Sequence, residues 1–214
     1  MLSFRDITLS HGNRILVRDI SFTIAPGECV LLAGPNGSGK TTLLKALSHR
    51  TASAVLIPTG IPKVKGFTVE AFIETGCYHS SDWRGRISAK TRERLEGALD
   101  LLGIHELKDR DIATLSDGEF QKACLAVALT REAELLLLDE PTAFLDVEGR
   151  VAILRTLRDV TRKTGISVLF SSHELHESLS VVDRVLALTR DGRFLQGGPD
   201  DKFLVIESVF PNIF

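Results

Sequence analysis

The sequence predicts an α/β protein in which a mostly parallel central sheet is joined by N-terminal antiparallel strands and an inserted helical region. The apolar run Cys29–Ala33 leads through the glycine-rich turn Gly34–Thr41 into a helix, an order typical of such sheets. The aliphatic runs Leu135–Leu138 and Ile166–Phe170 are typical of parallel strands that are buried on both faces. Helical periodicity dominates from about residue 68 to residue 110 and predicts the inserted region.

Further strands are predicted near both ends of the chain. Residues 2–10 and 15–24 alternate apolar and polar side chains, and His11-Gly12-Asn13-Arg14 forms the turn between them. Another strand is expected from Asp183 to Thr189, followed by an Asp191-Gly192 hairpin turn. The first pair would supply the antiparallel strands, and the last hairpin would close the sheet.

Two segments repeat apolar residues at helical spacing, and the tail from Asp200 is typical of a short amphipathic helix that ends at Pro211. The apolar face of the first helix is Leu95, Ala98, Leu99 and Leu102. The second helix places on one side Val147, Val151, Leu154 and Leu157.

The composition predicts a soluble intracellular protein. The 214 residues carry a net charge of −2, which gives no basic field for nucleic acid. The aliphatic runs are far shorter than the ~20 residues that span a bilayer, and Met1–Asp6 lacks the basic start and apolar stretch of a signal peptide. The three cysteines (Cys29, Cys77 and Cys124) are widely separated, which favours reduced, packed thiols over disulfides or a metal site.

The segment Gly34-Pro35-Asn36-Gly37-Ser38-Gly39-Lys40-Thr41 has the form of a phosphate-binding loop, G-x-x-x-x-G-K-T. Its glycines let successive N–H groups point at an anion, and the helix that continues from Thr42 adds partial positive charge. Lys40 can reach terminal phosphates, and the Thr41 hydroxyl can bind Mg²⁺. The loop therefore predicts a nucleoside triphosphate as ligand, against the alternative of a glycine turn that binds nothing.

Polar residues that could complete such a site follow two predicted strands. Asp139-Glu140 ends the strand from Leu135, and Ser171-Ser172-His173 ends the strand from Ile166. Ligands of α/β sheets bind beyond the carboxyl ends of strands, so these residues should face the phosphate loop. Asp139 suits the shell of a Mg²⁺ ion, and Glu140 could take a proton from water. A merely solvated acid pair and a structural histidine remain the alternatives.

Leu115–Lys122 is a third motif, in which Ser116 and Glu119 have the spacing of a capping box and predict a helix N-terminus. The order of the motifs along the chain resembles that of ABC-type ATP-binding cassettes, a branch of the P-loop NTPases. The resemblance covers nearly the whole chain and rests on Gly34–Thr41, Leu115–Glu119, Leu135–Glu140, Leu145-Asp146 and His173.

The resemblance implies an ATPase that uses ATP and Mg²⁺. Thr41 and Asp139 would hold Mg²⁺, Glu140 would polarise the attacking water, and His173 would touch the γ-phosphate. The nucleotide itself would be bound by Gly34, Pro35, Asn36, Gly37, Ser38, Gly39, Lys40, Thr41, Thr42 and His11.

The same resemblance implies a partner cassette, most simply a second copy of this chain in a homodimer. The signature residues would approach the γ-phosphate of ATP held by the other copy, and Asp146 would lie at the junction between the two sites. The signature residues are Ser116, Asp117, Gly118 and Glu119.

Within the family, the stretches Ile73–Tyr78 and Trp83–Ser88 look like importers of iron siderophores, haem and cobalamin. That likeness implies integral membrane permease subunits docking near residues 59–95, a solute-binding protein, and no nucleic acid. The chain would then be peripheral on the cytoplasmic face of the membrane. It would form a single domain over 1–214, with a nucleotide-binding core of 1–66 and 111–214 and a helical subdomain of about 67–110.

Four positions depart from the family's pattern. His11 stands where an aromatic residue usually stacks on adenine, and Thr59 stands where a glutamine is usual. Asp117 and Glu119 replace the usual glycine and glutamine of the signature, so we expect their carboxylates to repel the γ-phosphate when a dimer closes. Two other functions stay open: a partly degenerate cassette with weak ATPase and a regulatory role, and a non-transport ABC ATPase acting on nucleic acid.

Overall fold

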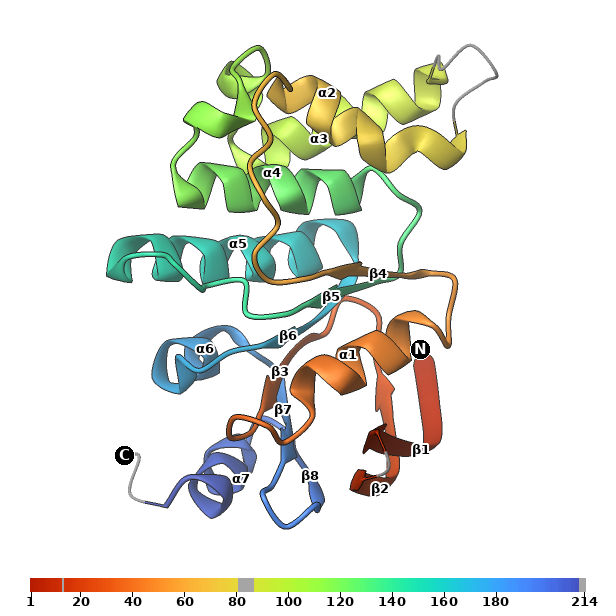
Figure 1. Ribbon diagram of the computed structural model, residues 1–214, viewed down its shortest axis with the longest axis vertical. Helices are drawn as coiled ribbons and strands as arrows, with labels where there is room; N and C mark the ends of the chain where they lie inside the picture. The colour runs from red at the N-terminus through yellow and green to blue at the C-terminus, as the bar shows by residue number, and fades with distance from the viewer. Residues whose placement is uncertain (13, 81–86, 212–214) are drawn as a thin grey trace.

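The predicted α/β architecture is confirmed by the structure, a computed structural model that describes residues 1–12, 14–80 and 87–211 (Figure 1). A six-stranded sheet has the order β4-β5-β6-β3-β7-β8, and only its β7–β8 pair is antiparallel. A separate antiparallel pair, β1–β2, precedes it. The strands are β1 (Leu2–His11), β2 (Arg14–Ile24), β3 (Cys29–Ala33), β4 (Ala54–Ile57), β5 (Leu135–Leu138), β6 (Ser167–Ser171), β7 (Arg184–Leu188) and β8 (Phe194–Gly197).

Helices cover the sheet, and their ends follow from local sequence. Ser88 accepts a hydrogen bond from Thr91 N at the start of α3, and Gly103 ends it with a φ of 63°. The α-helices are α1 (Lys40–Ser48), α2 (Val69–Glu74), α3 (Ala89–Leu102), α4 (Asp117–Leu129), α5 (Val147–Thr164), α6 (Leu175–Val181) and α7 (Lys202–Val209). The 3₁₀ segments are η1 (Thr75–Ser80), η2 (His105–Leu107) and η3 (Ile112–Thr114).

The sheet has one apolar cluster on each face. Leu135 and Leu137 of β5 belong to the cluster shared with α1, β1 and β2, whereas Leu136 and Leu138 belong to the cluster shared with the remaining helices. Neighbouring residues of a strand point to opposite faces, so a strand covered on both sides needs apolar residues at every position. This explains the uninterrupted run of leucines.

The inserted helices form a layer with α4, which packs against both α2 and α3. The predicted face of α3 is buried at Leu95, Ala98, Leu99 and Leu102. The two ends of the insertion meet where Thr68 bridges to Asp111 and Ile112 N donates to Phe67 O. Within the importer-like stretch Trp83–Ser88, the first four residues lie outside the described residues. The turn residue Asn13 also lies outside them.

The predicted apolar side of α5 is wrong at its first turn. Val147 is 67% exposed and Val151 is half-buried. The helix begins directly after its N-cap Asp146, but its buried residues start only at Ile153, so its first turn lies outside the apolar core. The residues of α5 that are buried are Ile153, Leu154, Leu157, Val160 and Thr161. In the tail, α7 ends at Val209, before Pro211, and buries only Ile206.

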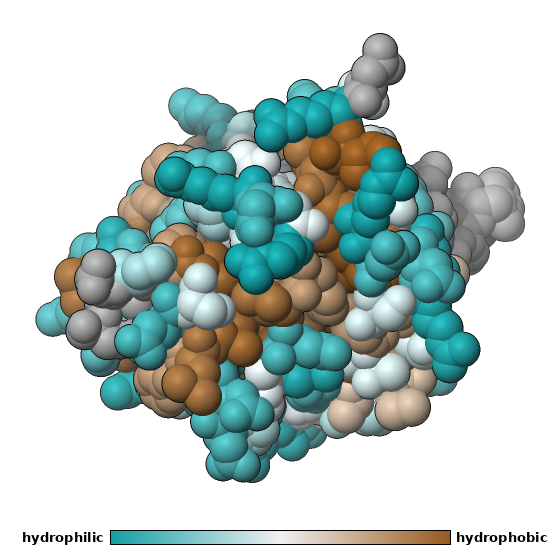
Figure 2. All heavy atoms as spheres, turned by 90° about the horizontal axis from the view of Figure 1, so that it is seen from below, coloured by the Kyte–Doolittle hydropathy of each residue, from teal (hydrophilic) through white to brown (hydrophobic). Residues whose placement is uncertain are grey.

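All three cysteines are buried, as predicted, and Cys29 and Cys124 are free thiols. Burial raises the pKa of both Cys29 and Cys124 to about 12. None of the helices in the described part of the chain combines the length and apolar character that crossing a bilayer requires. Seen from below, the surface mixes hydrophilic areas with smaller apolar patches (Figure 2), as globular surfaces ordinarily do.

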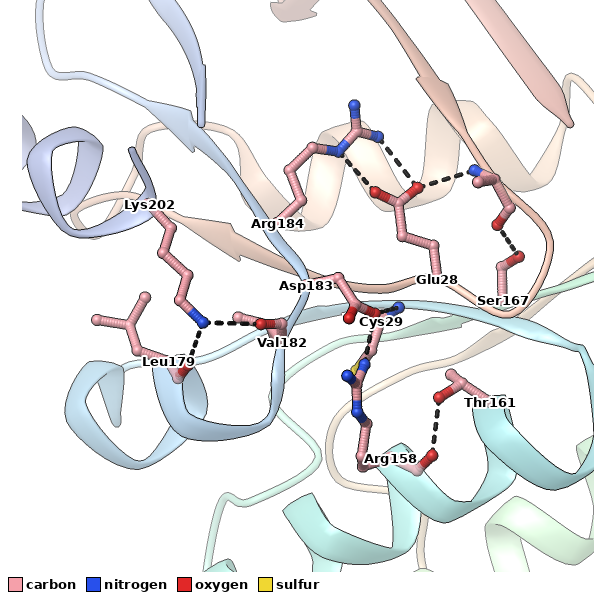
Figure 3. Close-up of polar contacts among 11 residues, drawn as sticks. Glu28, Cys29, Arg158, Thr161, Ser167, Leu179, Val182, Asp183, Arg184 and Lys202 are labelled. Atoms are coloured by element: carbon pink, nitrogen blue, oxygen red, sulfur yellow. Dashed lines mark hydrogen bonds and ion pairs between the residues drawn. The ribbon is translucent and has the colours of Figure 1, made fainter. Parts of the chain in front are cut away.

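A polar network joins the amino ends of β3 and β7 to the helices beside them (Figure 3). Asp183, just before β7, accepts hydrogen bonds from Cys29 N at 2.9 Å and from the Arg158 guanidinium. Next to it, Arg184 Nε lies 2.9 Å from Glu28 Oε1. Asp183 and Glu28 thus each have a cationic partner within the chain.

Candidate functional site

The loop between β3 and α1 has the backbone of an anion cradle. Gly37 and Gly39 have φ angles of 77° and 106°, which side chains disfavour. Among the described residues, Ser38 Oγ is buried at this loop without a hydrogen-bond partner. An unpaired hydroxyl inside a glycine-rich turn at a helix N-terminus fits a phosphate that would accept its hydrogen bond.

Lys40 is drawn into the loop rather than extended into solvent. Its side chain is 7% exposed, and Nζ donates to Gly34 O at 2.7 Å and to Pro35 O at 3.4 Å. Burial lowers the pKa of Lys40, although the carboxylates of Glu140 and Asp139 raise it in part. A buried ammonium group held only by carbonyls can turn to a bound phosphate at small cost.

Thr41 and Asp139 meet at the carboxyl edge of the sheet. Thr41 Oγ1 donates to Asp139 Oδ2 at 2.8 Å, and Ser171 Oγ donates to Asp139 Oδ1 at 2.8 Å. A hydroxyl and a carboxylate are hard oxygen ligands of the kind that Mg²⁺ takes beside phosphate oxygens and water. These two residues therefore fit a magnesium ion bound with a nucleotide.

Glu140 stands beside this pair in an unusual backbone conformation. Its φ is 50°, in the left-handed region that non-glycine residues seldom adopt. Its N–H donates to Ser171 Oγ at 3.0 Å, and its Oε1 lies 2.9 Å from His173 Nε2. The Glu140 side chain is 34% exposed, so water can reach it.

Ser171 links both acids, and the sequence prediction gave it no role. The parallel pairing of β5 with β6 sets Leu138 opposite Phe170, so the next residues, Asp139 and Ser171, also become neighbours. The sequence placed Ser171 at the end of its strand, but its bond to Asp139 depends on the register of the two strands, which no local pattern gives.

A pocket of about 380 Å³ opens beside the phosphate loop. It includes His11, the residue expected to stack on adenine, together with Arg14 and Leu16, which sequence reasoning did not single out. The sequence feature that could have revealed Arg14 and Leu16 is the turn predicted after His11, because such a turn sets the start of β2 beside His11. The lining residues are His11, Arg14, Leu16, Asn36, Gly37, Gly39, Lys40, Thr41, Thr42 and Glu140.

Two further predicted residues lie at the edges of this arrangement. Thr59 Oγ1, just beyond β4, donates to the Asp139 carbonyl at 2.5 Å. Asp146 Oδ1 accepts from Gly149 N at 2.8 Å and caps α5. Arg150 then joins the two neighbouring loops, because it donates to Leu145 O and pairs with Glu174.

The signature residues lie on the helical layer and are not among the residues that line the pocket. The predicted capping box is confirmed: Ser116 Oγ accepts from Glu119 N, and Glu119 Oε2 accepts from Ser116 N at 2.8 Å. Asp117 is paired with Lys63, whose Nζ lies 2.7 Å from Asp117 Oδ1. Gly118 has open space around its α-carbon.

Known proteins resemble this chain in sequence and in fold. The family model for ABC transporters matches residues 17–143. The zinc import ATP-binding protein ZnuC of Jannaschia sp. (strain CCS1) is 36% identical, over 88% of this chain and 79% of that protein. The petrobactin import ATP-binding protein FpuC of Bacillus anthracis is 28% identical, over 100% of this chain and 86% of that protein. A solved nucleotide-free ATP-binding cassette from an ABC transporter matches with a TM-score of 0.83 and 19% identity, over 97% of this chain and 95% of that chain.

The structural match shows the fold, and the family match covers more than half of the chain. Both agree with a phosphate loop, a carboxylate pair and a histidine gathered at one edge of a parallel sheet. The chain belongs to the ABC transporter family, and it is an ABC transporter ATPase.

Proposed function

We propose that this chain is the ATP-hydrolysing subunit of an importer for a metal ion or a metal chelate. The observation that carries the hydrolytic part is one cluster of contacts: Thr41 Oγ1 to Asp139 Oδ2 at 2.8 Å, and Glu140 Oε1 to His173 Nε2 at 2.9 Å. These contacts bring a metal-binding pair and an acid–histidine pair to the mouth of a phosphate loop.

Each residue has a task that follows from its present contacts. Lys40 exchanges its bond to Gly34 O for the terminal phosphates, while the loop amides and Ser38 Oγ take the remaining phosphate oxygens. Glu140 accepts a proton from the in-line water, and His173 leaves Glu140 to contact the γ-phosphate. His11 and Arg14 would flank the adenine ring at the far end of the pocket.

Thr41 and Asp139 would hold Mg²⁺, and Ser171 would keep the Asp139 carboxylate oriented toward it. A Mg²⁺ ion held there would neutralise negative charge that develops on the phosphate oxygens during transfer. The protein's own contribution is to present two oxygen ligands at a fixed separation, next to the residue that activates water.

A single chain leaves the signature residues away from the nucleotide pocket, which supports a dimer. In a homodimer, Ser116 and Gly118 of one copy would meet the γ-phosphate held by the other, with Asp117 and Glu119 beside them. Asp146 would lie between the two sites. The nucleotide-binding core would be residues 1–66 and 111–214, and the helical subdomain would be about 67–110.

Membrane subunits would be the second class of partner. A groove of about 420 Å³ runs between the edge strand β4 and the helical layer, within or next to the predicted docking region at residues 59–95. Its lining includes Val55, Gly76 and Arg94, whose guanidinium pairs with Glu132. The subunit would thus be peripheral on the cytoplasmic face of the membrane, working with permease subunits and a solute-binding protein.

The solute is proposed as a class. Relatives include zinc importers, such as ZnuC of Cereibacter sphaeroides at 36% identity, and siderophore systems, such as CbrD of Dickeya dadantii at 26% identity. The zinc relatives are more similar in sequence, and the siderophore relatives align over the whole chain. Uptake of radiolabelled zinc and of labelled ferric siderophores, in cells with and without this chain, separates the two.

Glu140→Gln tests the hydrolytic part, because it keeps the side-chain volume and removes the base. Turnover should fall by about 10²–10⁴, as expected for loss of a general base, while an ATP-stabilised dimer becomes easier to isolate by gel filtration. The matched control is Glu148→Gln on the exposed start of α5, which should leave the rate unchanged. A wild-type chain that binds ATP without turnover, alone and with its permease, would favour the degenerate regulatory cassette instead.

A further inference from the structure

Lys63 holds the first turn of the signature helix from a distant segment. Its Nζ donates to Asp117 Oδ1 at 2.7 Å and to Leu115 O at 2.8 Å, and it lies 5.6 Å from the centre of the Phe120 ring. Three groups at or just before the start of α4 thus converge on one ammonium group. The contact spans 54 positions along the chain.

The segment that carries Lys63 is fixed at its other end by the hydrolytic site. It runs from the end of β4 past α5 and α4 to α2 (Figure 1). Four residues before Lys63, Thr59 Oγ1 donates to the carbonyl of Asp139 at 2.5 Å. The same short segment therefore contacts the proposed magnesium ligand of its own site and the signature residues proposed to serve the opposite site.

The charges at the signature are balanced within the chain. Asp117 is paired with Lys63, and Glu119 Oε1 lies 3.7 Å from Arg110 NH1. The repulsion expected from Asp117 and Glu119 is therefore reduced, because each extra carboxylate stands beside a cation. Repulsion between like charges about 4 Å apart is about four times stronger at an effective dielectric of 20 than in water, so the pairing matters most when a closed dimer excludes water.

We propose that Lys63 is a positioning residue for hydrolysis across the dimer: it neutralises Asp117 and holds the first turn of α4 so that Ser116 and Gly118 can meet a γ-phosphate. The inference rests on the proposed homodimer. Lys63 is not among the residues that line the nucleotide pocket of its own chain. Its loss should therefore affect dimer closure and turnover, while ATP binding to a single subunit stays unchanged.

The test uses ATP-driven dimerisation of the Glu140→Gln chain, measured by sedimentation, together with turnover of the otherwise native chain. In a homodimer of Lys63→Met, each of the two equivalent signature contacts should lower the association constant about threefold, the size of an exposed ion pair. The dimer dissociation constant should therefore rise about tenfold. Turnover at saturating ATP should fall about threefold, with the half-saturating ATP concentration unchanged. The loss should be larger at low salt.

The decisive variant is Lys63→Met combined with Asp117→Asn. If Lys63 acts by neutralising Asp117, removing the carboxylate restores dimerisation to near the parent value, and Lys63→Arg retains it without a second change. A role in packing alone predicts that the double variant is as weak as Lys63→Met or weaker. That result would overturn the inference.

Lys65→Met is the matched control, since it removes the same charge from an exposed neighbour in the same segment. An effect equal to that of Lys63→Met would also overturn the inference, because net charge alone would explain it. Failure of the proposed function looks different: the parent chain would neither hydrolyse ATP nor dimerise with it, whatever stands at position 63.

Discussion

The two ends of the parallel strands carry the same kinds of charged side chains and use them differently. At the amino ends, Asp183 is bonded to Arg158 and Cys29 N, and Glu28 is bonded to Arg184 (Figure 3). These contacts connect distant segments, and each charge is matched.

At the carboxyl ends, we propose that the present partners occupy places that a ligand would take. Lys40 bonds a carbonyl, Thr41 bonds Asp139, and Glu140 meets His173. In the proposed function, each contact is exchanged for a phosphate, a metal ion or a water. The comparison assigns stability to the amino edge of the sheet and the proposed hydrolysis to the carboxyl edge, so substitutions should separate them.

The largest separation is expected for Lys40→Met. Turnover should fall by about 10²–10³, as for loss of an electrostatic group aimed at the transition state. Thermal stability should rise slightly, because burial lowers the pKa of Lys40 and so disfavours its charge in the folded chain. Calorimetry and a coupled ATPase assay measure both, with Lys45→Met on the exposed side of α1 as control. A clear decrease in the melting temperature of Lys40→Met would contradict the separation of stability from turnover.

Asp183→Asn should do the opposite. Unfolding in urea at pH 7 should show a loss of about 1–2 kcal/mol, below the 3–5 kcal/mol of fully buried pairs, because this pair is partly exposed. Turnover per folded molecule should be unchanged. Reduced turnover with intact stability would mean that the amino-end network also governs hydrolysis.

The same variant has a pH signature. Burial raises the pKa of Asp183, but the Arg158 guanidinium and Cys29 N–H outweigh it and hold that pKa below 3.8. A carboxyl whose folded pKa is lowered stabilises the protein above its ordinary value, and that contribution disappears as the pH falls through the folded value. The stability difference between the wild-type and Asp183→Asn chains should therefore shrink below pH 3.8.

Thiol chemistry gives a third contrast. With pKa values of about 12, Cys29 and Cys124 should resist iodoacetamide at pH 8 until the chain unfolds. A cysteine at the exposed loop position in Asn36→Cys should be labelled at once, and ATP should protect it. As pH rises above 9, the unfolded chain loses thiol protons that the native chain keeps, so stability should fall. Rapid labelling of native Cys29 would contradict the burial of this thiol at the amino end of β3.

The smallest effect is expected at Thr59. A glutamine there would reach past the Asp139 carbonyl toward the metal or water, so Thr59→Gln should raise turnover about twofold, the value of one weak hydrogen bond of ~0.5 kcal/mol. The reference is Thr59→Val, which removes the hydrogen bond to Asp139 O at nearly the same size. A rate for Thr59→Gln no higher than that of Thr59→Val would show that residue 59 does not occupy the glutamine position.

Local patterns predicted the strands, the phosphate loop and the capping box, because each is encoded within a few adjacent residues. The apolar run ending in Asp139-Glu140 predicted both a buried strand and the position of its acids. Contacts across the fold were not predictable. The link from Ser171 to Asp139 required the register of two strands, and the Lys63–Asp117 pair required the packing of an irregular segment on a helix. Val147 was misjudged because periodicity cannot say where a helix extends past its core.

The left-handed backbone of Glu140, with its φ of 50°, has a consequence for how damage to this protein is detected. Glycine would relieve roughly 1–2 kcal/mol of strain there, and its own entropic cost of roughly 0.5–1 kcal/mol offsets much of that gain. Glu140→Gly should therefore fold about as well as the native chain while losing its proposed base. Cellular proteases that act on unfolded chains would not distinguish the two. An inactive copy would persist at full abundance, and only selection on transport could remove it.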